Sequence, residues 1–385
     1  MDVMLNSDEA SIKEVARDIL GDLATPALAR DAESDPLGYS AKLWREVAAL
    51  DWIGLCLPDS VGGQGFPVHA AGLLLEEVGR FVAPIPLHST LTAALTIARH
   101  GSDELAARVL PAVCRGESIL TVAFQEGRST RTGQRLSTTA TRDGDEYVLT
   151  GVKHFVDNFA AAARCVVAAA DGRRVSLFVI DTDLPGISHT PLVTLAKDQQ
   201  SKVRFDHVRV PASALLGEAG AGQPILEAMI DYGTALLCSQ IAGATRRDAE
   251  FAIEHAKNRV AFGRPIAAFQ SIQHLAADRL IAVDGTELLT REALWRVGAD
   301  LPATVEVSQA KAFASEKCVF VCRSSQQIHG GIGFMMEFDL HLWYRRVVAW
   351  SLRYGTVAEH RARIARALLD TPGPVRLGMT QVLPA

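Results

Sequence analysis

Two short stretches decide how this chain is interpreted: Arg259-Val-Ala-Phe262-Gly263-Arg-Pro265-Ile-Ala-Ala-Phe269-Gln270, and, further on, Gln327-Ile-His-Gly330-Gly331. The second follows a stripe of small and apolar residues, from Val307 to Ser325, that repeats with the helical period. Its two glycines are a natural C-terminal stop for that helix. Cationic and amide donors, an aromatic ring and a glycine pair suit the phosphates and base of a nucleotide. The two stretches together therefore predict a nucleotide clamp.

Length and composition indicate a soluble protein of two or three domains. The chain has 385 residues, of which 48% are hydrophobic and 22% charged. A net charge of −5 gives no reason to expect nucleic acid or an anionic membrane as a partner. The N-terminus is acidic, and no apolar run approaches the roughly 18 residues that a bilayer crossing needs. We therefore expect a cytoplasmic protein without a membrane span.

The cysteines do not form a metal-binding pattern. Cys318 and Cys322 are one helical turn apart, but no second pair of His or Cys stands nearby at ligand spacing. We predict no metal site and expect six buried free thiols: Cys56, Cys114, Cys165, Cys238, Cys318 and Cys322.

Hydrophobic periodicity divides the chain into three parts. Residues 1–118 repeat apolar positions with the helical period, as in Ser11–Leu20. Residues 119–222 contain strand-like runs with turn signals at Asp143-Gly144 and Asp171-Gly172. Residues 223–385 are helical again. The predicted fold class is α+β, mainly α, with an N-terminal helical domain, a middle β domain and a C-terminal helical domain.

This order and its motifs resemble the acyl-CoA dehydrogenase family over nearly the whole chain. Supporting matches are Leu50–Pro58 followed by Gly62-Gly63-Gln-Gly65, and Gly151-Val-Lys153-His-Phe155. The specific matches are the two stretches quoted first. The resemblance implies that the middle domain is a β-barrel and that the C-terminal domain is a four-helix bundle.

The resemblance also implies a reaction and a cofactor. In that family a glutamate removes the α-proton of an acyl-CoA thioester while the N5 atom of FAD accepts the β-hydride. An electron-transfer flavoprotein is the implied electron acceptor. Each FAD is shared across a subunit interface, and one chain holds the ADP end of a neighbour's flavin. The implied ADP-side residues here are Arg259 at the pyrophosphate, Phe262 packed on the cofactor, Gln270 as a hydrogen-bonding group, and Gln327, Gly330 and Gly331 at the adenosine.

The chain departs from the family where the catalytic base is expected. The usual Tyr-Glu-Gly-Thr pattern is Arg353-Tyr354-Gly355-Thr356 here, and the second known position for the glutamate holds Gly233. A tyrosine, with a reference pKa near 10, is a poor base at neutral pH. We therefore predict no catalytic residue in this chain.

The flavin ring side is altered as well. Phe124–Thr130 replaces the family's Thr-Glu-Pro-x-x-Gly-Ser segment, and Phe155-Val156-Asp157 replaces Trp-x-Thr. This one-sided loss resembles the non-catalytic chains of heterotetrameric dehydrogenases that act on steroid side-chain acyl-CoA. The hypothesis is a subunit that completes the FAD site of a second acyl-CoA dehydrogenase chain carrying the catalytic glutamate.

Two alternatives remain open at this point. The chain could be a self-sufficient homotetrameric dehydrogenase whose base is Asp231 or Glu227. It could instead be an acyl-CoA-binding protein without a redox role. The residues do not specify the acyl group.

Overall fold

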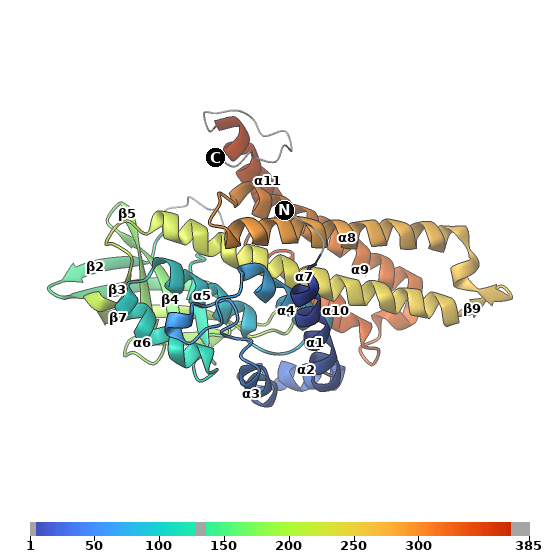
Figure 1. Cartoon of the computed structure of the whole chain (residues 1–385), viewed down its shortest axis with the longest axis horizontal. Helices are drawn as coiled ribbons and strands as arrows, with labels where there is room; N and C mark the ends of the chain where they lie inside the picture. The colour runs from blue at the N-terminus through green and yellow to red at the C-terminus, as the bar shows by residue number, and fades with distance from the viewer. Residues whose placement is uncertain (1–4, 128–135, 371–385) are drawn as a thin grey trace.

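The computed structural model describes residues 5–127 and 136–370 (Figure 1). It confirms the predicted order of helices, strands and helices. The predicted limits at 118 and 222 lie in the connections before β1 and before α7, and the division into domains remains a prediction. Part of two sequence predictions lies outside the described residues: the last residues, from 371 on, of the predicted C-terminal helical domain, and the last three positions of the Phe124–Thr130 segment.

The first part consists of six α-helices around an apolar core. They are α1 (Ser7–Leu23), α2 (Pro26–Ser34), α3 (Ala41–Ala49), α4 (Val68–Arg80), α5 (Leu87–His100) and α6 (Asp103–Cys114). Several of these helices begin at a residue whose side chain caps the free backbone N–H groups of the first turn. Asn6, for example, accepts hydrogen bonds from the backbone N–H groups of Asp8 and Glu9, which fixes the start of α1.

The strands form one mixed sheet, whose order is β6-β7-β3-β2-β4-β5-β8, with β1 paired in parallel to β4. The predicted β-barrel is thus an eight-stranded sheet with β6 and β8 at the ends of its described order. The predicted turns lie between antiparallel neighbours, with Gly144 joining β2 to β3 and Gly172 joining β4 to β5. The strands are β1 (Leu120–Ala123), β2 (Thr139–Asp143), β3 (Glu146–Asp157), β4 (Arg164–Asp171), β5 (Arg174–Asp181), β6 (Ile187–Pro191), β7 (Gln200–Pro211) and β8 (Leu215–Leu216).

Four helices of the last part pack against one another, namely α7 (Gln223–Asn258), α8 (Gln270–Gly298), α9 (Thr304–His329) and α10 (Leu340–Trp350). A shorter helix, α11 (Val357–Ala365), packs on α9. The predicted stripe on α9 is buried, from Val307 to Ser325. Gly330, at φ 63°, ends this helix as predicted.

Close packing of α4 on α7 joins the first part to the last. A Cβ atom on Gly243 would lie 1.7 Å from the backbone oxygen of Glu76, and one on Gly79 would lie 2.0 Å from that of Gln240. Only glycine permits this approach of two helix backbones. Helix α7, which carries Gly233, is therefore fixed to α4 by backbone contact.

The cysteine prediction is confirmed, because all six thiols are free and buried. Within residues 5–127 and 136–370, no cluster of His, Cys, Asp and Glu has the geometry of a metal site. In the same ranges, no helix combines the length and apolar character that a bilayer crossing requires.

Candidate functional site

The first quoted stretch forms a tight hairpin between α7 and α8. Its strands β9 (Val260–Ala261) and β10 (Arg264–Pro265) pair antiparallel. Phe262 and Gly263 make the two-residue turn, with φ angles of 53° and 79°. Positive φ at both central positions is typical of a hairpin turn whose twist matches its strands. The turn holds the Phe262 ring out from the molecule, 94% exposed.

The second quoted stretch lies against this hairpin region. Ile328 belongs to an apolar cluster with Ala252 and Ala256 on α7, and Ile266 packs on the same cluster. The rings of His255 and His329 stack, with centroids 4.3 Å apart. The end of α7, the start of α8 and the end of α9 therefore meet at one end of the helices (Figure 1). All six predicted cofactor residues are exposed there: Arg259, Phe262, Gln270, Gln327, Gly330 and Gly331.

This surface fits the ADP half of a dinucleotide. Within the described ranges no carboxylate pairs with Arg259, so its guanidinium is available to a pyrophosphate. Cβ atoms built on Gly330 and Gly331 would have nothing within 4 Å, which leaves open space over that backbone. A ligand can therefore approach the main chain closely. The roles assigned to single residues remain predictions.

The two positions at which the family places its glutamate touch each other. Gly233 lies within α7, and Tyr354 lies in the turn between α10 and α11. A Cβ atom on Gly233 would lie 2.4 Å from Cε1 of Tyr354. The tyrosine ring, 5% exposed, thus fills the space beside the glycine.

A buried lysine and a histidine hold the turn that carries Tyr354. Lys311 Nζ donates to the backbone oxygens of Ser351, at 2.9 Å, and Gly355, at 3.3 Å. His360 Nε2 donates to the backbone oxygen of Tyr354 at 3.0 Å. Burial lowers the pKa of Lys311 to about 8. These bonds stabilise a left-handed backbone at Tyr354, whose φ is 55°.

The immediate surroundings of Tyr354 are aromatic. The rings of His88 and Phe124 lie 5.5 and 5.4 Å from its ring. His88 Nε2 donates to the backbone oxygen of Gly233 at 2.8 Å, and burial lowers its pKa to about 4. Burial also raises the pKa of Tyr354, and the charge of Arg353 lowers this pKa by a smaller amount. Tyr354 therefore keeps its proton near pH 7 and cannot accept another, and His88, although unprotonated, is a weak base because its pKa is only about 4.

The two alternative bases do not lie free beside these positions. Asp231 is buried, accepts from Arg363 Nη2 at 2.7 Å and accepts from Thr304 Oγ1 at 2.8 Å. Asp231 also precedes Gly233 by two residues in the helix, so its side chain points about 200° around the helix axis from the position of Gly233. Glu227 is exposed and accepts from Gln223 Nε2 at 2.8 Å.

The ring-side departures form an ion pair that the sequence interpretation missed. Arg353 Nη2 pairs with Asp157, which stands at the expected threonine position, and Arg353 Nη1 donates to Asp198 at 3.2 Å. The available signal was that the departures from two family patterns, Tyr-Glu-Gly-Thr and Trp-x-Thr, carry opposite charges. Thr356, the conserved end of the Tyr-Glu-Gly-Thr frame, caps α11 by accepting from Glu359 N at 3.3 Å.

The two halves of the candidate site lie far apart in the chain. Along α7, a rise of about 1.5 Å per residue places Gly233 roughly 39 Å from Arg259. In Figure 1 the β9 hairpin is at the end of the molecule opposite the sheet. The structure therefore brings the ADP-side residues together and separates them from the ring-side residues.

Comparisons with known proteins agree with this architecture. Models of the acyl-CoA dehydrogenase N-terminal, middle and C-terminal domains match residues 6–117, 125–208 and 220–369. The probable acyl-CoA dehydrogenase YngJ of Bacillus subtilis is 27% identical, over 95% of this chain and 100% of its own length.

Solved structures show the same relationship. The Tcur3481-Tcur3483 steroid ACAD is 31% identical with a TM-score of 0.86, covering 94% of this chain and 98% of its own. The ChsE4-ChsE5 complex of Mycobacterium tuberculosis is 25% identical with a TM-score of 0.88, covering 97% and 100%. This chain belongs to the acyl-CoA dehydrogenase family.

Proposed function

We propose that this chain is a subunit of an FAD-dependent acyl-CoA dehydrogenase, that it lacks a catalytic base, and that it completes the FAD site of a second subunit carrying the glutamate. The observation that carries the proposal is the contact between Gly233 and Tyr354. Both positions for the base are occupied by one packed contact that contains no carboxylate. The ADP-side residues, in contrast, are exposed and accessible.

The separation of the two halves supports sharing of the cofactor between chains. Roughly 39 Å along α7 is farther than one dinucleotide reaches, so Arg259 and Tyr354 cannot hold the two ends of the same FAD. The ADP-side residues suit a flavin whose ring lies in another chain. The exposed Phe262 and Val260, 94% and 59% accessible, are apolar surface that such a partner would cover.

Each residue then has a physical task at the interface. Bound FAD supplies the hydride acceptor of the reaction. Arg259 neutralises pyrophosphate charge, and the open backbone at Gly330 and Gly331 admits the adenosine end. Phe262 provides a flat apolar contact, while Gln270 and Gln327 offer amide hydrogen bonds. The proton is removed by the partner's glutamate.

The comparisons suggest the kind of assembly and substrate. Among the similar structures, one is a steroid ACAD and another is a complex of two chains, ChsE4 and ChsE5. We therefore propose a heterotetramer of two unlike pairs, a bulky steroid side-chain acyl-CoA as the substrate, and an electron-transfer flavoprotein as the acceptor. We also propose that the assembly works in the cytoplasm.

The test compares the chain alone with the chain co-expressed beside a glutamate-carrying acyl-CoA dehydrogenase subunit. We expect flavin and turnover only in the mixed assembly, with one FAD per pair of unlike chains. Arg259→Met should lower the flavin retained by that assembly at least tenfold, because a charge-assisted contact is lost. Arg209→Met, on the exposed face of the sheet, is the matched control. Turnover by this chain alone, with one FAD per chain, would refute the proposal.

A further inference from the structure

Three charged side chains from separate elements meet on the ring side of this chain. Asp157 ends β3, Asp198 lies in the loop between β6 and β7, and Arg353 lies in the turn between α10 and α11. Arg353 pairs with Asp157 and donates to Asp198 at 3.2 Å. Their side chains are only 13%, 10% and 24% exposed, respectively, for Arg353, Asp157 and Asp198. We refer to these three residues as the ion triplet.

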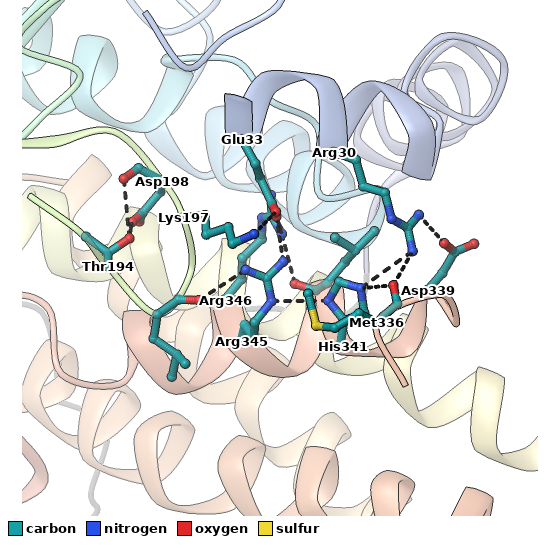
Figure 2. A network of polar contacts seen from close by, with 12 residues as sticks. Arg30, Glu33, Thr194, Lys197, Asp198, Met336, Asp339, His341, Arg345 and Arg346 are labelled. Carbon is teal, nitrogen blue, oxygen red and sulfur yellow. Dashed lines mark hydrogen bonds and ion pairs between the residues drawn. The ribbon is translucent and has the colours of Figure 1, made fainter. Parts of the chain in front are cut away.

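The loop that supplies Asp198 is itself anchored on both sides. Thr194 Oγ1 donates to Asp198 Oδ1 at 2.7 Å. Arg345 Nη1, from α10, donates to the backbone oxygen of Leu195 at 3.2 Å. Figure 2 shows Lys197 and Arg345 converging on Glu33 of α2, with the Arg345 ion pair at 2.7 Å. The sheet, α2 and α10 are therefore connected through this loop.

The members of the triplet need one another. Burial lowers the pKa of Arg353 to about 10, so the guanidinium still carries its charge at neutral pH. Burial raises the pKa of Asp198, and the charge of nearby Arg346 opposes that rise. A buried ion without its partner is strongly destabilising. Arg353 therefore links the strands to the C-terminal helices, and its removal would leave Asp157 buried without its ion-pair partner.

The space beside the triplet is too small for a flavin ring. The adjoining cavity measures about 90 Å³ and is lined by His88, Asn158 and Gln240 as well as by the triplet. Sites for small molecules and cofactors are usually on the order of 300–1,000 Å³. A tricyclic ring therefore does not fit beside the closed Arg353–Asp157 pair.

We infer that the ion triplet occupies this chain's own flavin-ring site and braces the sheet against the C-terminal helices in place of a cofactor. This inference concerns the ring site alone and stands whether or not the chain serves a partner's FAD. It implies that the isolated chain folds fully without flavin. It also implies that the isolated chain takes up no isoalloxazine ring.

The experiment uses the isolated full-length chain and two fragments of the cofactor. Riboflavin carries the ring without ADP, and ADP lacks the ring. By isothermal titration, we expect no riboflavin binding up to millimolar concentration and no change of Tm with riboflavin. Riboflavin binding to the wild-type chain with a Kd below about 100 μM would overturn the inference. A failure of ADP to compete for the flavin of the mixed assembly would instead count against the proposed clamp, so the two outcomes are distinguishable.

Variants test the bracing role separately. Arg353→Met should lower Tm by roughly 5 °C or more, because the buried Asp157 loses its cation and the half-buried Asp198 loses one of the cations near it. Arg209→Met is the matched control, since Arg209 also bonds two carboxylates, Asp143 and Glu146, each at 2.9 Å, but is exposed. Equal Tm values for the two variants would overturn the brace. If Arg353→Met fails to fold, the riboflavin titration of the wild-type chain still decides whether the ring site is closed.

Discussion

Substituting Gly233 by alanine tests the contact that fills both positions for the base. In an unobstructed helix this change stabilises by about 1 kcal/mol, because alanine has the higher helix propensity. Here the new Cβ atom would lie 2.4 Å from Cε1, 2.7 Å from Cζ and 2.9 Å from Oη of Tyr354. The ring cannot easily move away, because His88 and Phe124 pack against it. Overpacking of this kind costs roughly 1–3 kcal/mol.

We therefore expect Gly233→Ala to destabilise the chain by up to about 2 kcal/mol after the propensity gain. In the background of Tyr354→Ala the obstruction is gone, and the same change should stabilise by about 1 kcal/mol. The sign of the effect should thus reverse, with a coupling energy of about 1–3 kcal/mol between the two positions. A Gly21→Ala variant is the control, because a Cβ atom there meets only ordinary contacts, the nearest at 3.5 Å.

Urea unfolding of the wild type, the two single variants, the double variant and the Gly21→Ala control, analysed by linear extrapolation, measures these differences. Unchanged slopes would show that the variants unfold from the same native state. If Gly233→Ala stabilised the wild-type background as much as Gly21→Ala does, Tyr354 would not fill the space beside Gly233. The argument for an occupied base position would then fail.

Three further outcomes follow from the site. Burial lowers the pKa of His88 from an ordinary 6.5 to about 4, so the free energy of unfolding should fall by about 3 kcal/mol as pH falls from 6.5 through 4. Urea midpoints measured at pH 7 and pH 4 should therefore differ less in His88→Gln than in the wild type. Asp231→Asn should destabilise the chain by roughly 3 kcal/mol, because it breaks the buried pair with Arg363. Turnover of the mixed assembly should stay within twofold. Lost turnover with unchanged unfolding would instead identify Asp231 as a base. Removing the exposed Phe262 ring by Phe262→Ala should weaken the association of the unlike chains at least tenfold, as measured by sedimentation, without changing the unfolding of the isolated chain. Unchanged association would show that Phe262 is not an interface residue.

The sequence was most informative where local rules determine the structure. The stop at Gly330 and the hairpin turns at Gly144 and Gly172 follow from glycine's access to positive φ. The sequence is less informative for strand β6, because four of its five residues are exposed and it lacks the alternating pattern of a half-buried strand. The pattern is also weak in strand β2, since only Ala140 of its five residues is buried.

Contacts between distant parts of the chain could not be predicted in the same way. The glycine in α7 and the tyrosine after α10 were each identified as departures, yet nothing local indicates that Tyr354 packs on Gly233. The same holds for Arg353 and Asp157, which pair across the boundary between strands and helices. Complementary departures, such as a missing side chain with a large ring or a cation with a carboxylate, become informative only when their positions in the fold are known.

The physical difference between the two ends of the molecule explains why single reversions should not restore a catalytic site. On the ring side each departure has a structural counterpart, because the Tyr354 ring fills the space beside Gly233 and Arg353 neutralises Asp157. Placing a glutamate at 354 alone would leave that space empty and put a carboxylate between the His88 and Phe124 rings, where ionisation is disfavoured. On the ADP side, no counterpart from residues 5–127 or 136–370 covers the open backbone at Gly330 and Gly331 or the exposed hairpin. One end is thus packed as an interior, whereas the other remains an accessible surface that suits the cofactor of another chain.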